Sequence, residues 1–153
     1  MPRSGKPYVP AGRKKLKRRE RKLFKAARKA ARRADPMWSN FLVGAAVRSA
    51  EGKMYTGGNF ENDSYGLTIC AERAAIARGI AAEGSAFAAV AVAVFARPRS
   101  GSPASTPSPC GACRQVVYQY GPRRDVETTV IFPVRGKPRA FRIRDLLPVP
   151  FEL

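Results

Sequence analysis

The chain has 153 residues, a formal net charge of +18 and no histidine. This length suits one ordinary domain with a core of its own. No run approaches eighteen apolar residues, and the first residues lack the apolar segment of a secretory signal, so neither a membrane partner nor export is expected.

The positive charge is concentrated near the N-terminus. Residues 1–35 hold 15 lysines and arginines against 2 acidic residues, whereas residues 36–153 hold 14 against 9. We therefore divide the chain into a basic arm, residues 1–35, and a body, residues 36–153. Residues 1–15 are rich in proline and glycine, which predicts an extended segment. Residues 16–34 contain neither and are rich in Ala, Leu, Lys and Arg, so we expect a helix that ends before Pro36.

The helix of the arm carries one apolar stripe. Its members are spaced as i, i+4, i+7, i+8 and i+11, and they are Leu23, Ala27, Ala30, Ala31 and Ala34. Alanine adds little apolar surface, so we expect this stripe to dock on the body only weakly.

The body alternates between strand and helix patterns. Two strands joined by a tight turn precede a helix, a strand, a helix, a strand and a C-terminal segment, with the ranges 40–50, 54–60, 70–84, 87–95, 110–121, 128–134 and 137–153. The strand at 87–95 is apolar throughout, which is typical of a strand buried on both faces. In the C-terminal segment we expect a short strand, a helical turn at 144–147 and an irregular tail. This order predicts an α/β fold with a mixed sheet.

Three cysteines stand at the starts of the two body helices. Cys70 opens the first, and Cys110 and Cys113 occupy positions i and i+3 of the second. The free N–H groups and the dipole of a helix N-terminus stabilise thiolates, so the three sulfurs are expected to converge there. Three thiolates around Zn²⁺ leave a fourth position open, as in a catalytic zinc site, although Cys-x-x-Cys alone also suits a redox pair. An odd number of cysteines in a highly charged chain favours a cytoplasmic or other reducing compartment.

Glu72 follows Cys70 by two positions, where a carboxylate can shuttle protons for water activated by the metal. A ligand-x-Glu pattern followed by Pro-Cys-x-x-Cys is the signature of zinc deaminases, including a three-cysteine form. Three thiolates leave zinc with a net negative charge. Arg73 and Arg114 lie beside the ligands, where they are expected to compensate that charge by donating to sulfur.

Together with these cysteine and glutamate motifs, the sequence of residues 38–153 resembles that of the short, homotetrameric cytidine deaminases. The stretches GGNFENDSYGLTICAER and SPCGACRQV carry the resemblance, and SNFLVGAAV and LLPVPF belong to it. It implies a three-layer α/β/α sandwich around a mixed sheet of about five strands, with zinc on Cys70, Cys110 and Cys113. It also implies that Glu72 is the proton shuttle in hydrolysis of cytidine or deoxycytidine to uridine or deoxyuridine and ammonia, as in pyrimidine salvage.

The resemblance further implies which residues bind the nucleoside. The backbone of Ala71 would meet the pyrimidine edge, and Phe41 would line the base and ribose pocket. Asn59 and Glu61 would bind the ribose 3′-hydroxyl. Purely structural roles stay open for Phe41 as a core residue and for Asn59 as a turn residue.

A homotetramer is implied as well. Tyr65 would reach into the site of a neighbouring subunit, and Phe151 would stack on the base from another subunit. Tyr65 also suits a simple loop residue, and Arg73 suits a solvated helix position.

Several positions depart from the family pattern. Met37-Trp38-Ser39 stands where Pro-Tyr-Ser is usual, Gly58 replaces a cysteine, and Asp63 replaces an alanine. Asp63 would accept a hydrogen bond from a free 5′-hydroxyl and repel a 5′-phosphate, or would point to solvent. A blasticidin S type of deaminase shares the zinc motifs but lacks the Asn-x-Glu-Asn run kept at residues 59–62. We therefore rank that type below the cytidine deaminases. A cytosine-nucleoside antibiotic stays an alternative substrate because the composition does not narrow the substrate.

The basic arm leaves three hypotheses. The chain is an enzyme for free nucleosides whose arm binds RNA or DNA, a deaminase of RNA or single-stranded DNA, or a non-catalytic subunit of a ribonucleoprotein such as a ribosome. A nuclear or organellar address also fits the arm. A 3′-phosphodiester would clash with Glu61, and a non-catalytic chain has no chemical need of Glu72, so we favour the first. The cations expected to contact phosphates are Arg13, Lys14, Lys15, Lys17, Arg18, Arg19, Arg21, Lys22 and Lys25.

Overall fold

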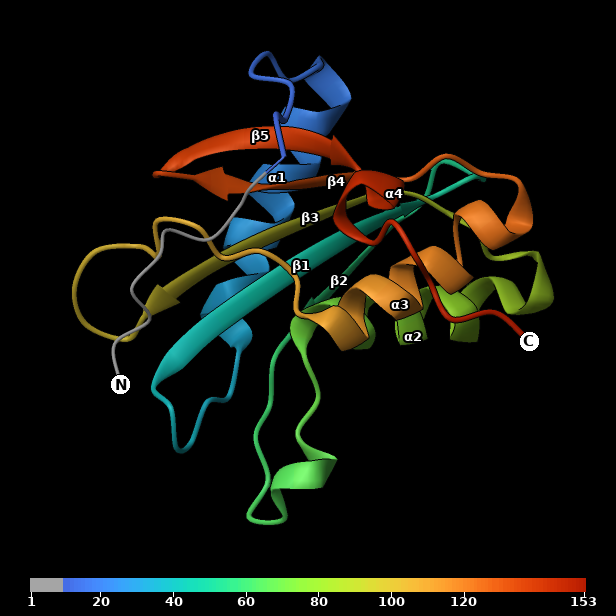
Figure 1. The fold of residues 1–153 in the computed structure, drawn as a ribbon. Helices are drawn as coiled ribbons and strands as arrows, with labels where there is room; N and C mark the ends of the chain where they lie inside the picture. Colours follow the sequence, from blue (N-terminus) through green and yellow to red (C-terminus); the bar gives the residue numbers. More distant parts are fainter. Residues whose placement is uncertain (1–9) are drawn as a thin grey trace.

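The computed structural model describes residues 10–153, so most of the predicted N-terminal extended segment lies outside the described residues. A five-stranded sheet has helices on both faces (Figure 1). In chain order the helices and strands are α1 (Arg18–Ala30), β1 (Phe41–Ser49), β2 (Met54–Gly58), α2 (Ala71–Glu83), β3 (Ala89–Pro98), α3 (Gly111–Gln119), β4 (Thr129–Val134), β5 (Lys137–Arg142) and α4 (Ile143–Leu146). Short 3₁₀ turns connect several of them.

The strand order is β2-β1-β3-β4-β5, and only β3 and β4 run parallel. The sheet is therefore mixed, as the order of elements predicts. The central strand β3 extends to Pro98, three residues beyond the predicted end, because Pro98 still pairs with Phe41 of β1. The prediction that this strand is buried on both faces is confirmed along most of its length.

Alternation along β1 and β3 divides the core between the two faces of the sheet. Ala45 and Val47 pack against α2 and α3, whereas Ala46, Ala91 and Ala93 pack against α1. The helices thus form separate layers, with α1 on one face and α2 and α3 on the other (Figure 1). The three-layer α/β/α prediction is confirmed. None of the helices in residues 10–153 has the length and apolar character that a membrane crossing requires.

The described part of the basic arm is one of these layers. Its helix begins at Arg18 rather than at residue 16, and Ala31–Arg33 continue it as a 3₁₀ turn. The apolar stripe of this helix is docked on the body, because Leu23 and Ala27 are completely buried. That the docking is weak stays a prediction. The facing residues of the sheet are mostly alanines, so small side chains on both surfaces let the helix approach closely.

The chain before α1 is also held by the body. The backbone of Arg13 exchanges two hydrogen bonds with Ala140 of β5, at 2.8 and 3.1 Å, and the side chain of Leu16 is buried. The Arg13 guanidinium is 2.5 Å from a carboxylate oxygen of Glu20, and the other carboxylate oxygen accepts the N–H of Lys17 at the start of α1. These contacts tie residues 13–20 to the edge of the sheet.

Candidate active site

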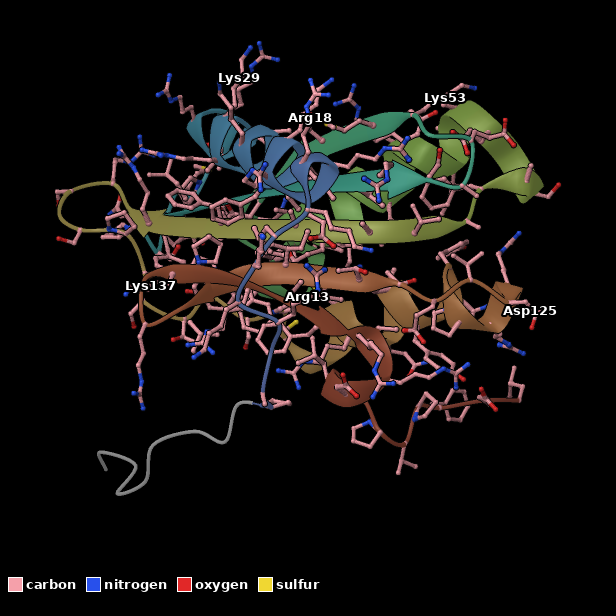
Figure 2. All side chains as sticks on the ribbon, turned by 90° about the horizontal axis from the view of Figure 1, so that it is seen from above. Arg13, Arg18, Lys29, Lys53, Asp125 and Lys137 are labelled. Carbon is pink, nitrogen blue, oxygen red and sulfur yellow. The ribbon has the colours of Figure 1, made fainter. Side chains whose placement is uncertain are left out.

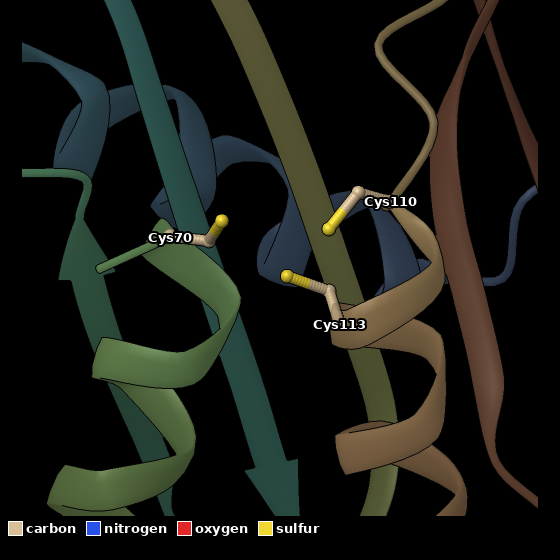
Figure 3. Close-up of side chains that lie close together, drawn as sticks. All are labelled: Cys70, Cys110 and Cys113. Atoms are coloured by element: carbon tan, nitrogen blue, oxygen red, sulfur yellow. The ribbon is translucent and has the colours of Figure 1, made fainter. Parts of the chain in front are cut away.

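Three thiols meet where α2 and α3 begin. Cys70 is the residue before α2, Cys110 is the residue before α3, and Cys113 lies in the first turn of α3. Figure 3 shows their side chains directed toward a common point between the two helices. The three sulfur atoms lie within 4.8 Å of one another. The structure therefore brings together all three predicted ligands.

Local packing positions the two helix starts. Gly57 of β2 lets α2 approach, because a Cβ there would lie 2.6 Å from the backbone nitrogen of Ala75. On the other side, the Arg114 guanidinium donates to the carbonyl oxygens of Pro109 and Leu146, both at 2.9 Å. A third hydrogen bond, of 3.4 Å, reaches the hydroxyl of Ser108. Arg114 thus holds the loop that precedes Cys110, and its donation to sulfur stays a prediction.

The donor set fits zinc. Tetrahedral bonds of about 2.3 Å would place the sulfur atoms about 3.8 Å apart, which is compatible with three sulfur atoms that lie within 4.8 Å of one another. Hydrogen bonding from Cys113 is the main cause that lowers the pKa of Cys70 to about 6, and the Cys110 thiol and the charge of Arg73 add to it. Donation to Cys70 and burial raise the pKa of Cys113.

Glu72 lies beside this cluster and is only 4% exposed. Burial above all, together with the charge of the neighbouring Cys70 thiolate, raises its pKa to about 7. A carboxyl group with a pKa near neutrality can both accept and return a proton under physiological conditions.

A pocket of about 200 Å³ opens over the thiols and Glu72. Phe41, Asn59 and Ala71 line it, as the sequence predicts, together with Cys70, Cys110 and Glu72. Sequence reasoning missed the remaining lining residues, which are Val43, Thr68, Ile69, Val94, Ala96, Pro107 and Ser108. Phe41 and Val43 of β1, and Val94 and Ala96 of β3, are each two positions apart and so point to the same face of the sheet. This alternation could have predicted Val43, Val94 and Ala96 once the ends of the strands were known.

The family model for the cytidine and deoxycytidylate deaminase zinc-binding region matches residues 17–129. This chain belongs to that family. It is 35% identical to the cytidine deaminase of Sporosarcina psychrophila over 135 residues, which are 82% of this chain and 93% of that protein. The matched region begins at residue 17, so it includes α1 of the basic arm.

Solved cytidine deaminases share the fold. The enzyme from Mycobacterium tuberculosis superposes with a TM-score of 0.69 and 38% identity, covering 87% of this chain and 97% of that one. The enzyme from Burkholderia pseudomallei gives a TM-score of 0.71 and 38% identity over 86% and 98%. The predicted deaminase activity and the zinc cofactor are confirmed at the level of the family.

Asn59 occupies a buried position in the deaminase, joined to the backbone of β1. Its side-chain oxygen accepts the N–H of Val43 at 2.8 Å, and its side-chain nitrogen donates to the carbonyl of Phe41 at 3.0 Å. Asn59 therefore has two roles: it satisfies backbone groups at the start of β1, and it lines the pocket.

Glu61 lies outside the group of residues that line the pocket. Its carboxylate accepts the Ser39 hydroxyl at 2.5 Å and the backbone N–H groups of Ser39 and Trp38 at 3.0 and 2.6 Å. These hydrogen bonds, that of the Ser39 hydroxyl above all, hold its pKa below the ordinary value. In this structure Glu61 anchors the segment that replaces the usual Pro-Tyr-Ser.

Tyr65 and Phe151 do not line the pocket of their own chain, and their side chains are 78% and 67% exposed. Asp63 is exposed on the same loop as Tyr65. The departure at Gly58 has a packing reason, because a Cβ there would lie 2.9 Å from the Cα of Ala34. A larger side chain would push away the segment that follows α1.

Proposed function

We propose that this deaminase hydrolyses free cytidine and deoxycytidine to uridine or deoxyuridine and ammonia. The observation that carries the proposal is the buried carboxyl of Glu72 in the wall of the same pocket that Cys70 and Cys110 line. When bound by the three cysteines, zinc supplies a Lewis acid that activates water for hydrolysis.

Glu72 carries the protons in this proposal. It takes one from the attacking water and delivers it to N3 of the pyrimidine. It then takes the second from the hydroxyl now bonded to C4 and gives it to the amine, so that the C4=O bond forms as the C4–N bond breaks. Its burial keeps bulk water away from these transfers, and its raised pKa lets it act as both base and acid. Overall one water is consumed and one ammonia is released.

The rest of the pocket suits a nucleoside. The ring of Phe41 with Val43 and Val94 offers an apolar wall for the base, and Ala71 presents its backbone at the start of α2. We assign the ribose 3′-hydroxyl to Asn59 and Glu61. Both are already hydrogen-bonded, so a substrate would share the carboxylate of Glu61 with Ser39 or displace it.

The same assignment disfavours nucleic acid as the substrate. A 3′-phosphodiester would bring a negative charge against the carboxylate of Glu61, and the hydrogen bonds that lower the pKa of Glu61 favour its charged form further. A non-catalytic role in a ribonucleoprotein is disfavoured by Glu72, since its burial costs free energy and no ion pair within residues 10–153 offsets that cost, unlike that of Glu20.

A homotetramer accounts for the exposed apolar surface around the site. Trp38, Phe60, Tyr65 and Leu67 are each at least 46% exposed. We propose that a neighbouring subunit covers them and that Tyr65 and Phe151 complete the sites of neighbours. Mixing inactive Tyr65→Ala and Glu72→Ala chains under subunit exchange should restore part of the activity. Failure of the mixture to regain any activity would oppose a contribution of Tyr65 between subunits.

Nucleic-acid binding by the basic arm is a second candidate function. The observation in its favour is that only Arg13, among the arm's cations in the described residues, has an ion-pair partner. Dense unpaired cations repel one another unless a polyanion is near.

Because the zinc site needs reduced thiols, we place the protein in a reducing compartment such as the cytoplasm.

The decisive experiment is deamination followed by ultraviolet absorbance, with zinc content measured on the same sample. Cytidine and deoxycytidine should be converted, an internal cytidine of an oligonucleotide should react far more slowly, and blasticidin S should be a poor substrate. Faster conversion of the oligonucleotide or of blasticidin S would overturn the assigned substrate.

A further inference from the structure

Two opposite stripes run along α1. Leu23, Ala27 and Ala31 face the sheet and are buried. On the other side, exposed cations recur at i, i+4, i+7, i+11 and i+14, and they are Arg18, Lys22, Lys25, Lys29 and Arg32. At a rise of about 1.5 Å per residue these five cations extend over roughly 21 Å. Figure 2 shows Arg18 and Lys29 directed away from the sheet.

The surface beside these cations is hollowed. A groove of about 480 Å³ lies between α1 and the edge strand β2, lined by Lys22, Lys25, Arg28, Lys29 and Arg32 together with Ala26 and Met54. A second hollow of about 520 Å³ shares Lys22 and Met54 with the first and is also lined by Arg19 and Arg48. No acidic residue lines either hollow. We call the two together the α1 groove.

The body contributes to the α1 groove through Arg48. Alternation along β1 puts Arg48 on the same face of the sheet as Ala46, which packs against α1. Arg48 pairs with Met54 of β2 in the antiparallel register, so the two stand side by side at the floor of the groove. Lys53, in the adjacent turn, adds an exposed cation on the same side of the molecule as Arg18 and Lys29 (Figure 2).

The groove suits a phosphodiester backbone rather than bases or lipid. Phe24, the aromatic residue of α1, packs edge-on against Phe95 with ring centroids 6.1 Å apart, so it is not free to stack on a base. Insertion into a lipid surface needs an exposed apolar helix face, and that face of α1 is buried on the sheet. A row of cations roughly 21 Å long, laid parallel to the axis of a duplex, spans about six base-pair rises of 3.4 Å.

We propose that the α1 groove, including Arg48, is a docking site for the phosphate backbone of double-helical nucleic acid, separate from the nucleoside pocket. This inference rests on the proposed nucleic-acid binding of the basic arm. The groove lies on the face of the sheet opposite α2 and α3, whose first turns carry the thiols. Nucleic acid bound there leaves the pocket open to free nucleosides, so docking and deamination do not compete.

Anisotropy of labelled RNA and DNA duplexes of about 20 base pairs tests the site in the full-length zinc protein. Wild type should bind both, with a log–log salt slope of roughly −4 to −5 if about five cations engage. Replacing Lys22, Lys25 and Lys29 together by Glu should abolish binding. Arg48→Gln should reduce the magnitude of the slope by about 1 and weaken binding roughly five- to ten-fold at about 0.1 M salt.

Lys137→Gln is the matched control, because Lys137 is exposed at the far edge of the sheet and loses the same charge (Figure 2). Each variant should keep wild-type cytidine deamination, which also reports that it is folded. Equal effects of Lys137→Gln and Arg48→Gln would overturn the groove while leaving nucleic-acid binding in place. Absence of duplex binding by wild type at about 50 mM salt, or binding only to vesicles of phosphatidylserine, would overturn nucleic-acid binding itself.

The separation of the two sites has its own readout. Saturating duplex should change the KM for cytidine less than about two-fold, as expected for ligands on opposite faces of a sheet. Competitive inhibition of cytidine deamination by the duplex would show that the two ligands share a site and would overturn the proposal.

Discussion

Gly44 of β1 and Ala31 at the end of α1 pack without room for a side chain between them. A Cβ on Gly44 would lie 2.2 Å from the backbone nitrogen of Ala31 and 2.2 Å from the carbonyl oxygen of Ala27. Both obstacles are backbone atoms, which cannot rotate away. The contact explains how a helix with mostly alanine on its apolar face becomes a full layer of the fold.

Gly44→Ala should therefore displace α1 and destabilise the protein by about 1–3 kcal/mol, the usual cost of overpacking a core. Gly66→Ala is the control, because a Cβ on Gly66 meets nothing within 4 Å. Urea denaturation of both variants gives the comparison. Equal stability of the two variants would mean that α1 is not closely packed on β1.

Glu20 predicts a pH dependence of stability. Burial opposes its ionisation, but the hydrogen bonds from Arg13 and from the Lys17 backbone prevail and lower its pKa in the folded state. A lowered pKa contributes stability at neutral pH that is lost as the pH falls below the ordinary glutamate value of about 4.3. Glu20→Gln should thus destabilise the protein at pH 7 by about 1–3 kcal/mol and by less at about pH 3. Glu51→Gln, at an exposed turn position, is the control. Urea denaturation should give it the same stability as wild type at both pH values.

Cys110→Ser should lose zinc and activity together. Cys110 is the most exposed of the three thiols, so its replacement disturbs the core least and tests the metal site directly. Wild type should contain one zinc per chain by elemental analysis. A metal-free variant with full activity would contradict the zinc mechanism.

Glu72→Gln should keep zinc and the fold but lose activity. General acid–base catalysis alone contributes about 10²–10⁴-fold, and one carboxyl group here serves several proton transfers. Because Gln has nearly the same shape, the loss should appear in kcat with little change in thermal stability. Wild-type kcat in this variant would rule out Glu72 as the proton shuttle.

Asn59→Ala should affect binding and stability at once. It leaves the N–H of Val43 and the carbonyl of Phe41 without their partners, which costs about 1–3 kcal/mol per buried group at most. The KM for cytidine should rise because the same residue lines the pocket. A rise in KM without any loss of stability would show that the strand contacts are dispensable.

The thiol cluster and Glu72 could be predicted from the sequence because the motifs that indicate them are short and local. The i, i+3 spacing of Cys110 and Cys113 and the position of Glu72 two residues after Cys70 depend only on neighbours along a helix start. The missed pocket residues come from β1, β3 and two loops, and they meet only when distant segments fold together. The sequence predicts Glu61 in the pocket, but its carboxylate accepts hydrogen bonds from Ser39 and Trp38, which lie 22 and 23 positions away in the chain.

By itself the sequence determined the order of helices and strands, the three candidate zinc ligands and the concentration of positive charge, because periodicity, spacing and composition are properties of the chain. Only the tertiary structure decided that the basic helix is a layer of the domain and that Arg48 joins its cations. It also decided that this surface lies opposite the thiols. The physical reason is that these relations follow from burying apolar surface between distant segments, with Gly44 setting how closely α1 can approach the sheet.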